Sequence, residues 1–453
     1  MERQLTSDAY GHILTNIGCW TADSEWIVYD TRSDPAGSRF DGRWIERVHV
    51  ATGRVERVYE SQHGAYCGVV TCCPVSHRAV FILGPEHPTE DWQYSACHRR
   101  GLILDLATRQ TLPLDAMCLS APLIAGALRG GSHVHTFDGR GQLVAFTYED
   151  HLLTAAAAAG RAVERNQRSI GLSTPVRAVE VHAGHPRNHP GSHFSLLLTR
   201  TWDAPVPGSD QIQRAYEDAW VGRSGYRLPI SSKTQLSSNT QLSSKTQAGT
   251  SEPCSVQPAV AFLGDVITET GDVLTELFLV DVPADLTQAG EHGPLEGTLS
   301  SRPRPPRGAR QRRLTFTADR AYPGVAGPRH WPRSLPDGSL IFFLMRDSTG
   351  VPQLWSIAPT GGAPRQLTHL SGGVSSAFSV SYDGQWLAHT ASGCVCRTST
   401  TTGHTQFLTT PTDPLFAPRP EACVFAPHDQ RIAYIRPVAL GDQLWNQVFV
   451  IDP

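Results

Sequence analysis

One short pattern of apolar and polar positions recurs along this chain. An alternating apolar run leads into a polar turn rich in Pro, Asp and Gly, and a second apolar run follows. Alternation with a two-residue period is typical of β-strands, so each copy predicts a β-hairpin. The copies occupy residues 19–30, 71–82, 135–146, 333–344, 379–390 and 424–435.

A second pair of alternating segments follows the hairpins. Examples are residues 45–60, 100–114 and 353–368. A recurring unit of four strands, about 40–50 residues long, is typical of a β-propeller. Counting the units, with an irregular fourth one, predicts an all-β, seven-bladed propeller that forms a single domain over residues 1–453.

The two ends of the chain predict how the ring closes. A fourth-strand motif reads RRLT at 312–315, RQLT at 365–368 and QFLT at 406–409, and RQLT also stands at 3–6. The last unit ends at 447–453 with a third strand and has no fourth. We therefore expect the N-terminal strand to complete the last blade, which removes exposed sheet edges.

Blade four is the irregular unit. Residues 193–201 predict its inner strand, and residues 259–267 and 276–283 predict its second and third strands. Residues 208–222 predict a short helix that carries Glu217, Asp218 and Trp220, with Ser209 or Asp210 as its cap. A second helix is expected within blade three, at 152–167.

Two segments have too little apolar content to predict ordered elements. Residues 223–256 contain a polar six-residue repeat, and they predict a disordered insert within blade four. Residues 300–311 are rich in Pro and Arg and predict a mobile segment.

Four segments carry a resemblance to a known group of proteins. They read LRGGSHVH, GSDQIQRAYEDAWVG, RRLTFTADRAYPG and PRHW. With the hairpin repeat, they resemble a family of single-domain, TolB-like (WD40-like) propellers. The resemblance implies the seven-bladed fold and a cytoplasmic setting, and it implies no particular activity.

Composition narrows the possible partners and location. Charged residues are 18% of the chain and the net charge is −3, which argues against a nucleic-acid binder. No apolar run approaches the roughly 20 residues that a membrane helix needs. The N-terminus has no basic segment followed by an apolar core, so no secretory signal is expected. The 10 cysteines show no paired metal-ligand spacing and predict free, buried thiols in the cytoplasm.

Histidines recur at one position of the predicted hairpins. In each hairpin we take as reference the position just before the turn, which is Phe137 in blade three and Ser334 in blade five. His133 and His330 stand four residues before these positions. The triplet Gly-Ser-His at 131–133 recurs at 191–193, which predicts that His193 occupies the same register in blade four. Equivalent inner-strand residues of neighbouring blades are expected to converge at the mouth of the central channel. His135, two residues after His133, is expected to share its face.

Three converging imidazoles predict a metal site. Neutral imidazole is a good ligand for divalent Zn, Mn or Fe, and three protein ligands leave a position open for water or substrate. Arg129 and Arg329 precede two of these histidines, and paired hydrogen bonds from arginine can hold a carboxylate or phosphate. We expect His133, His193 and His330 as metal ligands, and Arg129, Arg329 and His135 as catalytic residues. The alternative is that each histidine is a hydrogen-bonded structural residue.

Two classes of function remain open. The His-x-His run at 133–135 is similar to part of the metal site of the seven-bladed oligogalacturonate lyases, although Gly130 stands where they have glutamine. That similarity implies a metal-dependent, lyase-like enzyme acting on a carbohydrate or another small anionic molecule. The alternative is a non-catalytic scaffold that binds a protein, a peptide or a ligand at the channel mouth.

Overall fold

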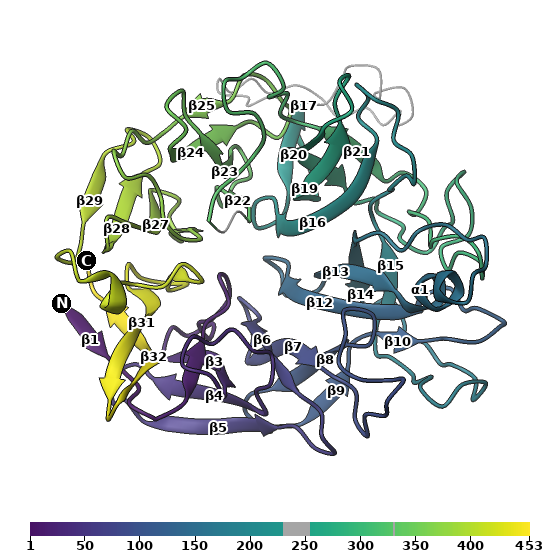
Figure 1. Ribbon diagram of the computed structural model, residues 1–453, viewed down its shortest axis with the longest axis horizontal. Helices are drawn as coiled ribbons and strands as arrows, with labels where there is room; N and C mark the ends of the chain where they lie inside the picture. The colour runs from purple at the N-terminus through teal and green to yellow at the C-terminus, as the bar shows by residue number, and fades with distance from the viewer. Residues whose placement is uncertain (230–253, 329–330) are drawn as a thin grey trace, which may run out of the picture.

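Seven sheets form the body of the molecule. The computed structural model describes residues 1–229, 254–328 and 331–453, and within them seven four-stranded antiparallel sheets stand around a common centre (Figure 1). The sheets follow one another around the ring in chain order. This confirms the prediction of an all-β, seven-bladed propeller.

In blades two and three the two inner strands match the predicted hairpins, whereas the inner strand of blade one lies before residue 19, where its hairpin was expected to begin. From the innermost strand outward, blade one is β2 (Gly11–Ile13), β3 (Trp26–Arg32), β4 (Trp44–His49) and β5 (Val55–Glu60). Blade two is β6 (Cys67–Cys72), β7 (Arg78–Leu83), β8 (Arg100–Asp105) and β9 (Thr111–Pro113). Blade three is β12 (Gly130–Phe137), β13 (Val144–Asp150), β14 (Ser169–Thr174) and β15 (Phe194–Leu197).

The remaining blades complete the ring. Blade four is β16 (Ile212–Trp220), β19 (Ala259–Ile267), β20 (Val273–Asp281) and β21 (Arg310–Arg313). Blade five is β22 (Arg333–Ser334), β23 (Ile341–Arg346), β24 (Pro352–Ile357) and β25 (Arg365–Gln366). Blade six is β26 (Ser379–Val380), β27 (Trp386–Ala391), β28 (Cys394–Ser399) and β29 (Thr405–Phe407). Blade seven is β30 (Cys423–Phe425), β31 (Ile432–Leu440), β32 (Gln443–Ile451) and β1 (Glu2–Gln4).

The N-terminal strand closes the ring as predicted. β1 pairs antiparallel with β32, so that Arg3 lies opposite Val450. Apolar side chains on both sides of the closure pack together, because Trp20 and Ile27 of blade one share a buried cluster with Val448 and Val450 of blade seven. The two chain ends are therefore held by strand pairing and by burial of apolar surface.

Blade four corrects the predicted strand order. Residues 194–197 form β15, the outermost strand of blade three, and not the inner strand of blade four. The inner strand of blade four is β16, which lies within residues 208–222, predicted to be a helix. The second and third strands lie close to the predicted ranges. The shift by one strand changes the position of every side chain assigned between 193 and 222.

A few small elements stand outside the sheets. Helix α1 (His151–Ala158) covers the start of the predicted 152–167 helix and is capped by the Asp150 carboxylate, which accepts from the Leu153 amide. A 3-10 turn, η2, spans Pro414–Phe416, and β10 (Ala116–Met117) pairs with β11 (Ala127–Leu128).

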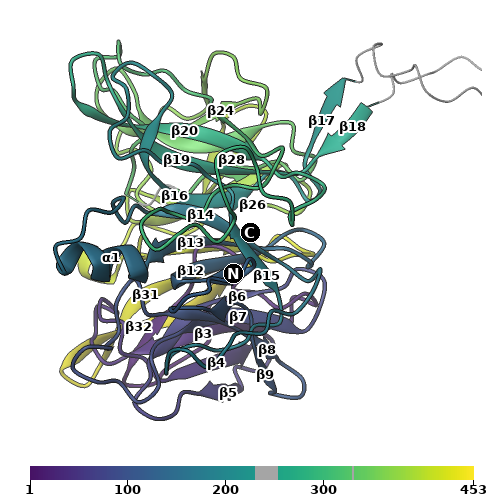
Figure 2. The same cartoon turned by 90° about the vertical axis from the view of Figure 1, so that its right-hand side faces the viewer.

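The flanks of the predicted polar insert form a small ribbon. β17 (Tyr226–Pro229) pairs with β18 (Cys254–Gln257), and Figure 2 shows this ribbon standing out from the ring. The sequence predicts a disordered insert over 223–256, but both flanks of that range are ordered strands. Its middle, residues 230–253, lies outside the described residues.

The Pro/Arg-rich segment at 300–311 makes specific contacts. Arg302 is 5% exposed, donates to the carbonyl oxygens of Arg165 and Thr201, and pairs with the Asp203 carboxylate. Arg304 pairs with Glu164. These ion pairs tie the segment, which was predicted to be mobile, to the loops beside blades three and four.

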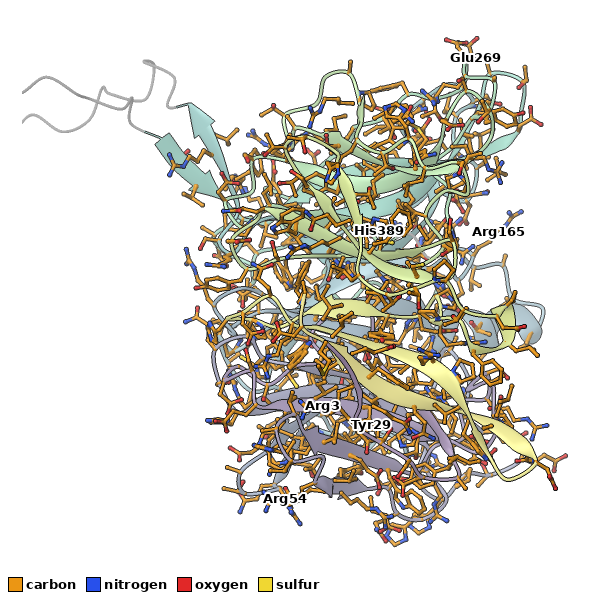
Figure 3. The ribbon with its side chains drawn as sticks, turned by 90° about the vertical axis from the view of Figure 1, so that its left-hand side faces the viewer. Arg3, Tyr29, Arg54, Arg165, Glu269 and His389 are labelled. Carbon is orange, nitrogen blue, oxygen red and sulfur yellow. The ribbon has the colours of Figure 1, made fainter. Side chains whose placement is uncertain are left out.

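The apolar core is divided between neighbouring blades. Val28 and Ile45 of blade one pack with Phe81 and Leu104 of blade two, and similar clusters lie between other sheets. Figure 3 shows side chains filling these layers: Tyr29 and His389 are fully buried, whereas Arg54 and Glu269 lie at the periphery. In the described residues, no helix is both long and apolar enough to cross a membrane.

Candidate functional site

The structure separates two of the predicted metal ligands. His133 lies on β12 and His193 directly precedes β15, at opposite edges of the blade three sheet. Three strand spacings of about 4.8 Å put the two residues roughly 14 Å or more apart. Ligand nitrogens lie about 2 Å from a metal ion, so this pair does not fit one ion. Among the residues that the structure describes, no three His, Cys, Asp or Glu side chains are grouped to hold a metal.

His193 has a structural environment. Its backbone amide donates to the Leu114 carbonyl of the segment after β9, and its Nδ1 lies 2.8 Å from Ser192 Oγ. Burial lowers its pKa to about 4, and the positive charge of Arg78 adds to the effect. The second Gly-Ser-His triplet therefore joins the outer edge of blade three to blade two. The third predicted ligand, His330, and the predicted catalytic Arg329 lie outside the described residues.

His135 is held in a closed network between blades two and three. Ser132 Oγ donates to Asp115 Oδ2 at 2.6 Å, and His135 Nε2 lies 3.0 Å from the same hydroxyl oxygen. Since the serine uses its one proton for Asp115, the histidine must donate to it. A histidine in that role cannot take the serine proton, so the set does not act as a nucleophile and base. His135 is completely buried, and burial lowers its pKa to about 3. The ring is therefore enclosed between two blades, and the catalytic role expected of His135 stays a prediction.

Arg129, predicted to be catalytic, is a structural anchor. It is 1% exposed, and its Nε donates to Asp150 Oδ2 at 2.7 Å. Its other nitrogens donate to the carbonyl oxygens of Glu296, Thr298 and Ser301. All three guanidinium nitrogens donate, and the bonds from Nη1 and Nη2 hold the 296–301 loop against blade three.

The structure instead places a cavity at the centre of the ring. It has a volume of about 370 Å³ and is lined by residues of all seven blades, near the hairpin turns that follow the inner strands. Residues of its rim are exposed, with Val75 at 59% and Tyr382 at 48%, so the cavity opens on that face. Aromatic side chains of five blades contribute to its wall: Trp20, Phe137, Trp220, Tyr382 and Phe425.

A buried acid lines this cavity. Asp218 lies on β16 and is 1% exposed; its Oδ1 accepts from Thr147 Oγ1 at 3.3 Å and its Oδ2 has no hydrogen-bond partner. Burial raises the pKa of Asp218 to about 7, against the opposing effect of the nearby Arg333 charge. Its carboxyl group can therefore gain or lose a proton near neutral pH.

A buried arginine of the next blade lies near the Asp218 carboxyl group. Arg333 of β22 is 5% exposed and donates through Nη2 to the backbone oxygen and Oδ1 of Asn16, at 3.1 and 2.7 Å. This contact joins blade five to blade one across the centre of the ring. Its Nε has no partner, and burial lowers its pKa to about 10. Within the described residues no ion pair joins Arg333 to Asp218, so each keeps an unused polar atom.

The inner strands of blades two to four are bent at the same position. Val69, Val134 and Glu217 have φ values of 56°, 53° and 54°, each three residues before the end of its strand. The strand register shifts at all three places. A β-branched or bulky residue with such a φ costs about 1–3 kcal/mol, and such strain concentrates at functional sites. The bend also breaks the alternation that was expected to place His133 and His135 on one face.

Sequence reasoning missed Asp218 and Arg333. Residues 208–222 resemble a helix, which hid the fact that Trp220 occupies the same hairpin position as Phe137 and Ser334. Aligned on that position, Asp218 stands two residues before it and Arg333 one residue before it. That alignment was the available signal, because inner-strand residues near the turn line the cavity.

Comparison with known proteins identifies the family. The chain is 41% identical over 446 residues to the Escherichia coli (strain K12) protein "Uncharacterized protein YidR", covering 98% of this chain and 96% of that one. The chain belongs to the YidR family. A family model described as "Protein of unknown function (DUF3748)" matches residues 66–189, which span blade two and most of blade three in this YidR-family propeller.

Solved structures share the fold at low sequence identity. An oligogalacturonate lyase in complex with manganese is 11% identical, covers 99% of this chain and 92% of that chain, and has a TM-score of 0.52. The oligogalacturonate lyase of Vibrio parahaemolyticus is 8% identical, covers 100% and 93%, and has a TM-score of 0.52. These values establish a common propeller architecture.

Proposed function

We propose that this YidR-family propeller binds a small, ring-shaped molecule carrying a carboxylate in its central cavity, and that Asp218 exchanges a proton with it. One observation carries the proposal: Asp218 and Arg333 line an aromatic-walled cavity, each has an unused polar atom, and no hydrogen bond or ion pair joins the two. A ligand with an anionic group and a proton to exchange would satisfy both residues.

The cavity suits such a ligand in size and chemistry. Its volume of about 370 Å³ lies within the range of small-molecule sites. Aromatic side chains such as Trp220 and Tyr382 offer flat apolar surfaces to a sugar or aromatic ring. Arginine holds carboxylates through directed hydrogen bonds, and Arg333 carries its charge in a site from which bulk water is largely excluded.

The catalytic form of the proposal is a lyase-like elimination on a uronate. Arg333 would bind the carboxylate and withdraw electron density from the adjacent carbon. Ionised Asp218 would take the proton from that carbon, the C–H electron pair would form a C=C bond, and the neighbouring C–O bond would break. The departing oxygen would take a proton from solvent. A pKa near 7 keeps a large fraction of Asp218 ionised at neutral pH.

No step is assigned to a metal ion. The solved oligogalacturonate lyase binds manganese, and our sequence-based expectation was a divalent Zn, Mn or Fe ion held by histidines. His133 and His193 do not fit a shared ion, as described above. The charge that acts on the carboxylate in this proposal belongs to Arg333.

The test uses galacturonate and short oligogalacturonates with the full-length protein. Calorimetry measures binding, and the ultraviolet absorbance of an unsaturated product measures elimination. We expect Arg333→Met to weaken binding by at least tenfold and Asp218→Asn to abolish elimination while leaving binding within about threefold. Arg346→Met, an exposed arginine on β23 of the same blade, is the matched control.

The outcomes separate the two classes of function. Binding that depends on Arg333, with elimination that depends on Asp218, supports the enzyme. Binding that depends on Arg333 without product supports a non-catalytic ligand-binding propeller. No binding of either probe, or binding unaffected by Arg333→Met, contradicts the proposed site.

We also place the protein in the cytoplasm, with neither nucleic acid nor a membrane as a partner. The thiols support this location: nine cysteines of the described chain are free and buried, where a reducing compartment would leave them. Measurement of the protein in cell fractions tests the assignment.

A further inference from the structure

The central cavity has a buried end and an open end. At the buried end, Asp218 and Arg333 are 1% and 5% exposed. At the open end the lining includes Arg223, Tyr382 and His428, whose side chains are exposed. The function proposed above uses only the charged groups of the buried end. A ligand that reaches from one end to the other would also meet the side chains of the rim.

Arg223 is a cation of the rim without an acid to pair with. It stands three residues beyond the end of β16 and forms part of the cavity wall. Asp218 supplies the only carboxylate in the described part of the lining, and it lies at the buried end. Among the residues that the structure describes, Arg223 makes no ion pair. Its charge therefore faces the mouth of the cavity uncompensated.

The rim holds the Arg223 side chain in a defined orientation. Its Nη2 donates to the backbone oxygen of Tyr382 at 2.7 Å, and its guanidinium carbon lies 3.6 Å from the centre of the Tyr382 ring. The Arg223 amide donates to the Pro336 carbonyl at 2.9 Å, which fixes the backbone. Within the described chain, Nε and Nη1 have no hydrogen-bond partner. An arginine that is oriented before binding loses less freedom when it engages an anion.

One carboxylate does not balance the charges along the cavity. A carboxylate bound at Arg333 would neutralise the positive charge of the buried end. Asp218, whose pKa burial raises to about 7, contributes further negative charge at that end when it is ionised. The charge of Arg223 at the open end would still lack a partner. A second acidic group at the outer end of the ligand would supply it.

We propose that Arg223 determines the specificity of the central site by binding a second acidic group, so that the preferred ligand carries a carboxylate at each end. This inference rests on the function proposed above, because the first carboxylate binds at Arg333. The cavity volume of about 370 Å³ lies in the range that encloses drug-sized ligands, which are larger than a single sugar ring.

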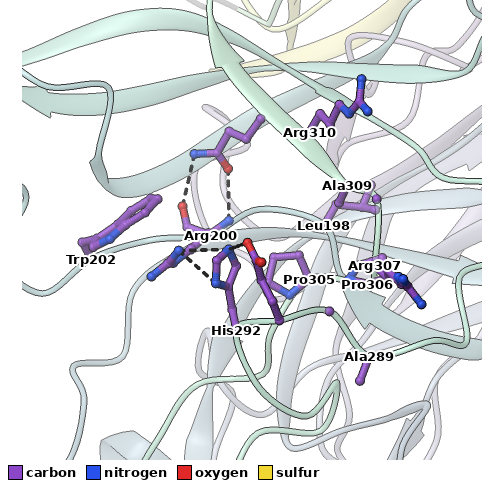
Figure 4. Close-up of a pocket in the computed structure, with 14 residues that line it drawn as sticks. Leu198, Arg200, Trp202, Ala289, His292, Pro305, Pro306, Arg307, Ala309 and Arg310 are labelled. Carbon is purple, nitrogen blue, oxygen red and sulfur yellow. Dashed lines mark hydrogen bonds and ion pairs between the residues drawn. The ribbon is translucent and has the colours of Figure 1, made fainter.

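The arginines of a second cavity lack this arrangement. That cavity has a volume of about 810 Å³ and lies at the outer edge of the ring, where Arg200, Arg307 and Arg310 line it (Figure 4). Their guanidinium groups point away from one another, and Arg200 Nη1 lies 3.0 Å from His292 Nε2. An anion there would meet one guanidinium at a time. Arg307 is exposed and does not line the central cavity, so Arg307→Gln is a matched control for Arg223→Gln.

The experiment compares digalacturonate, which carries two carboxylates, with galacturonate, which carries one. Calorimetry on the full-length protein at low ionic strength is expected to show digalacturonate binding at least about fivefold more tightly. Arg223→Gln should remove this preference and leave galacturonate binding within about twofold of the wild type. Arg223→Lys keeps the charge and should retain most of the preference, and Arg307→Gln should retain all of it. Each measurement is repeated with Asp218→Asn also present, so that elimination does not consume the ligand.

The outcomes separate this inference from the function on which it rests. Loss of the digalacturonate preference in Arg223→Gln, with galacturonate binding intact, supports the assignment. Equal binding of the two probes by the wild type, or a preference that survives in Arg223→Gln because it comes from ring contacts, overturns it. So does equal weakening of both probes in a variant whose thermal midpoint shows that it is folded, because that result indicates a structural role. In these cases the proposed function still stands if galacturonate binding depends on Arg333. If neither probe binds, both the proposed function and this inference are wrong.

Discussion

Two buried arginines of this propeller differ in what their side chains contact. Arg129, 1% exposed, is paired with Asp150, and its remaining donors reach backbone carbonyls. Arg333, 5% exposed, reaches Asn16, makes no ion pair with any described residue and leaves Nε unused, although the acid Asp218 is nearby. The first arginine holds a loop in place, and the second leaves bonding capacity for a ligand.

The comparison shows that burial of charge does not by itself indicate function. A buried charge is costly unless it is paired and hydrogen-bonded, so a protein keeps an unpaired one only where something else compensates it. In the outer part of blade three the compensation is internal. In the central cavity a bound molecule would supply the compensating charge. The following predictions test whether the two arginines differ in this way.

The largest effect is expected from Arg129→Ala. The substitution leaves Asp150 as a buried carboxylate without its partner and removes the donors to the 296–301 loop. We expect the free energy of unfolding to fall by about 3–5 kcal/mol, measured by urea denaturation. Arg161→Ala is the exposed control and should change it by less than about 0.5 kcal/mol. A loss near 1 kcal/mol in Arg129→Ala would mean that the anchor is replaceable.

Asp218→Asn should reveal the pH dependence of the central site. The pKa of Asp218 is about 7 in the folded protein, whereas an aspartate in the unfolded chain has its ordinary pKa of 3.8. The folded state therefore binds the proton more tightly. Stability from this group is therefore lost as pH rises from about 4 to 7. At about 1.4 kcal/mol per pH unit, Asp218→Asn should exceed the wild type by up to about 4 kcal/mol at pH 8 and equal it near pH 4. The free energy of unfolding of both proteins is measured by denaturation across pH. Taking the difference between the two proteins at each pH cancels the contributions of the other titrating groups. A constant difference at all pH values would contradict the raised pKa.

Arg333→Met should cost much less stability than Arg129→Ala. It removes an unpaired buried charge, which lowers the free energy of the folded state, and it leaves Asn16 without a donor, which raises it by about 1 kcal/mol. We expect the unfolding free energy to change by less than about 1.5 kcal/mol in either direction. A loss as large as that of Arg129→Ala would make both arginines structural and end the distinction between them.

The smallest effect is expected at His193. His193→Gln replaces a residue at the outer edge of blade three, so it should leave uronate binding in the central cavity unchanged within error. Manganese bound per protein molecule, measured by metal analysis after dialysis, should also equal that of the wild type. Loss of metal in this variant would restore the histidine site predicted from the sequence.

Blade four shows why the site was harder to predict than the fold. In β16 the buried positions are Ile212, Ala215, Asp218 and Ala219, a spacing that resembles a helix. The register shifts between Tyr216 and Ala219, beside the positive φ of Glu217, interrupt the two-residue period of a strand. The same local bend that distorts the pattern also shapes the wall of the cavity. A strained inner strand is therefore both functionally informative and difficult to recognise from periodicity.

The sequence by itself determined the architecture: the recurring hairpins predict seven blades, and the terminal RQLT motif predicts how the ring closes, because strand alternation and turn chemistry are local properties. It did not determine which charged side chains remain unpaired. Arg129 meets a loop about 170 residues further along the chain, and Arg333 meets Asn16 across 317 residues. Such contacts depend on which sheets become neighbours when the ring closes, so only the tertiary structure decided that one arginine is an anchor and the other lines a site.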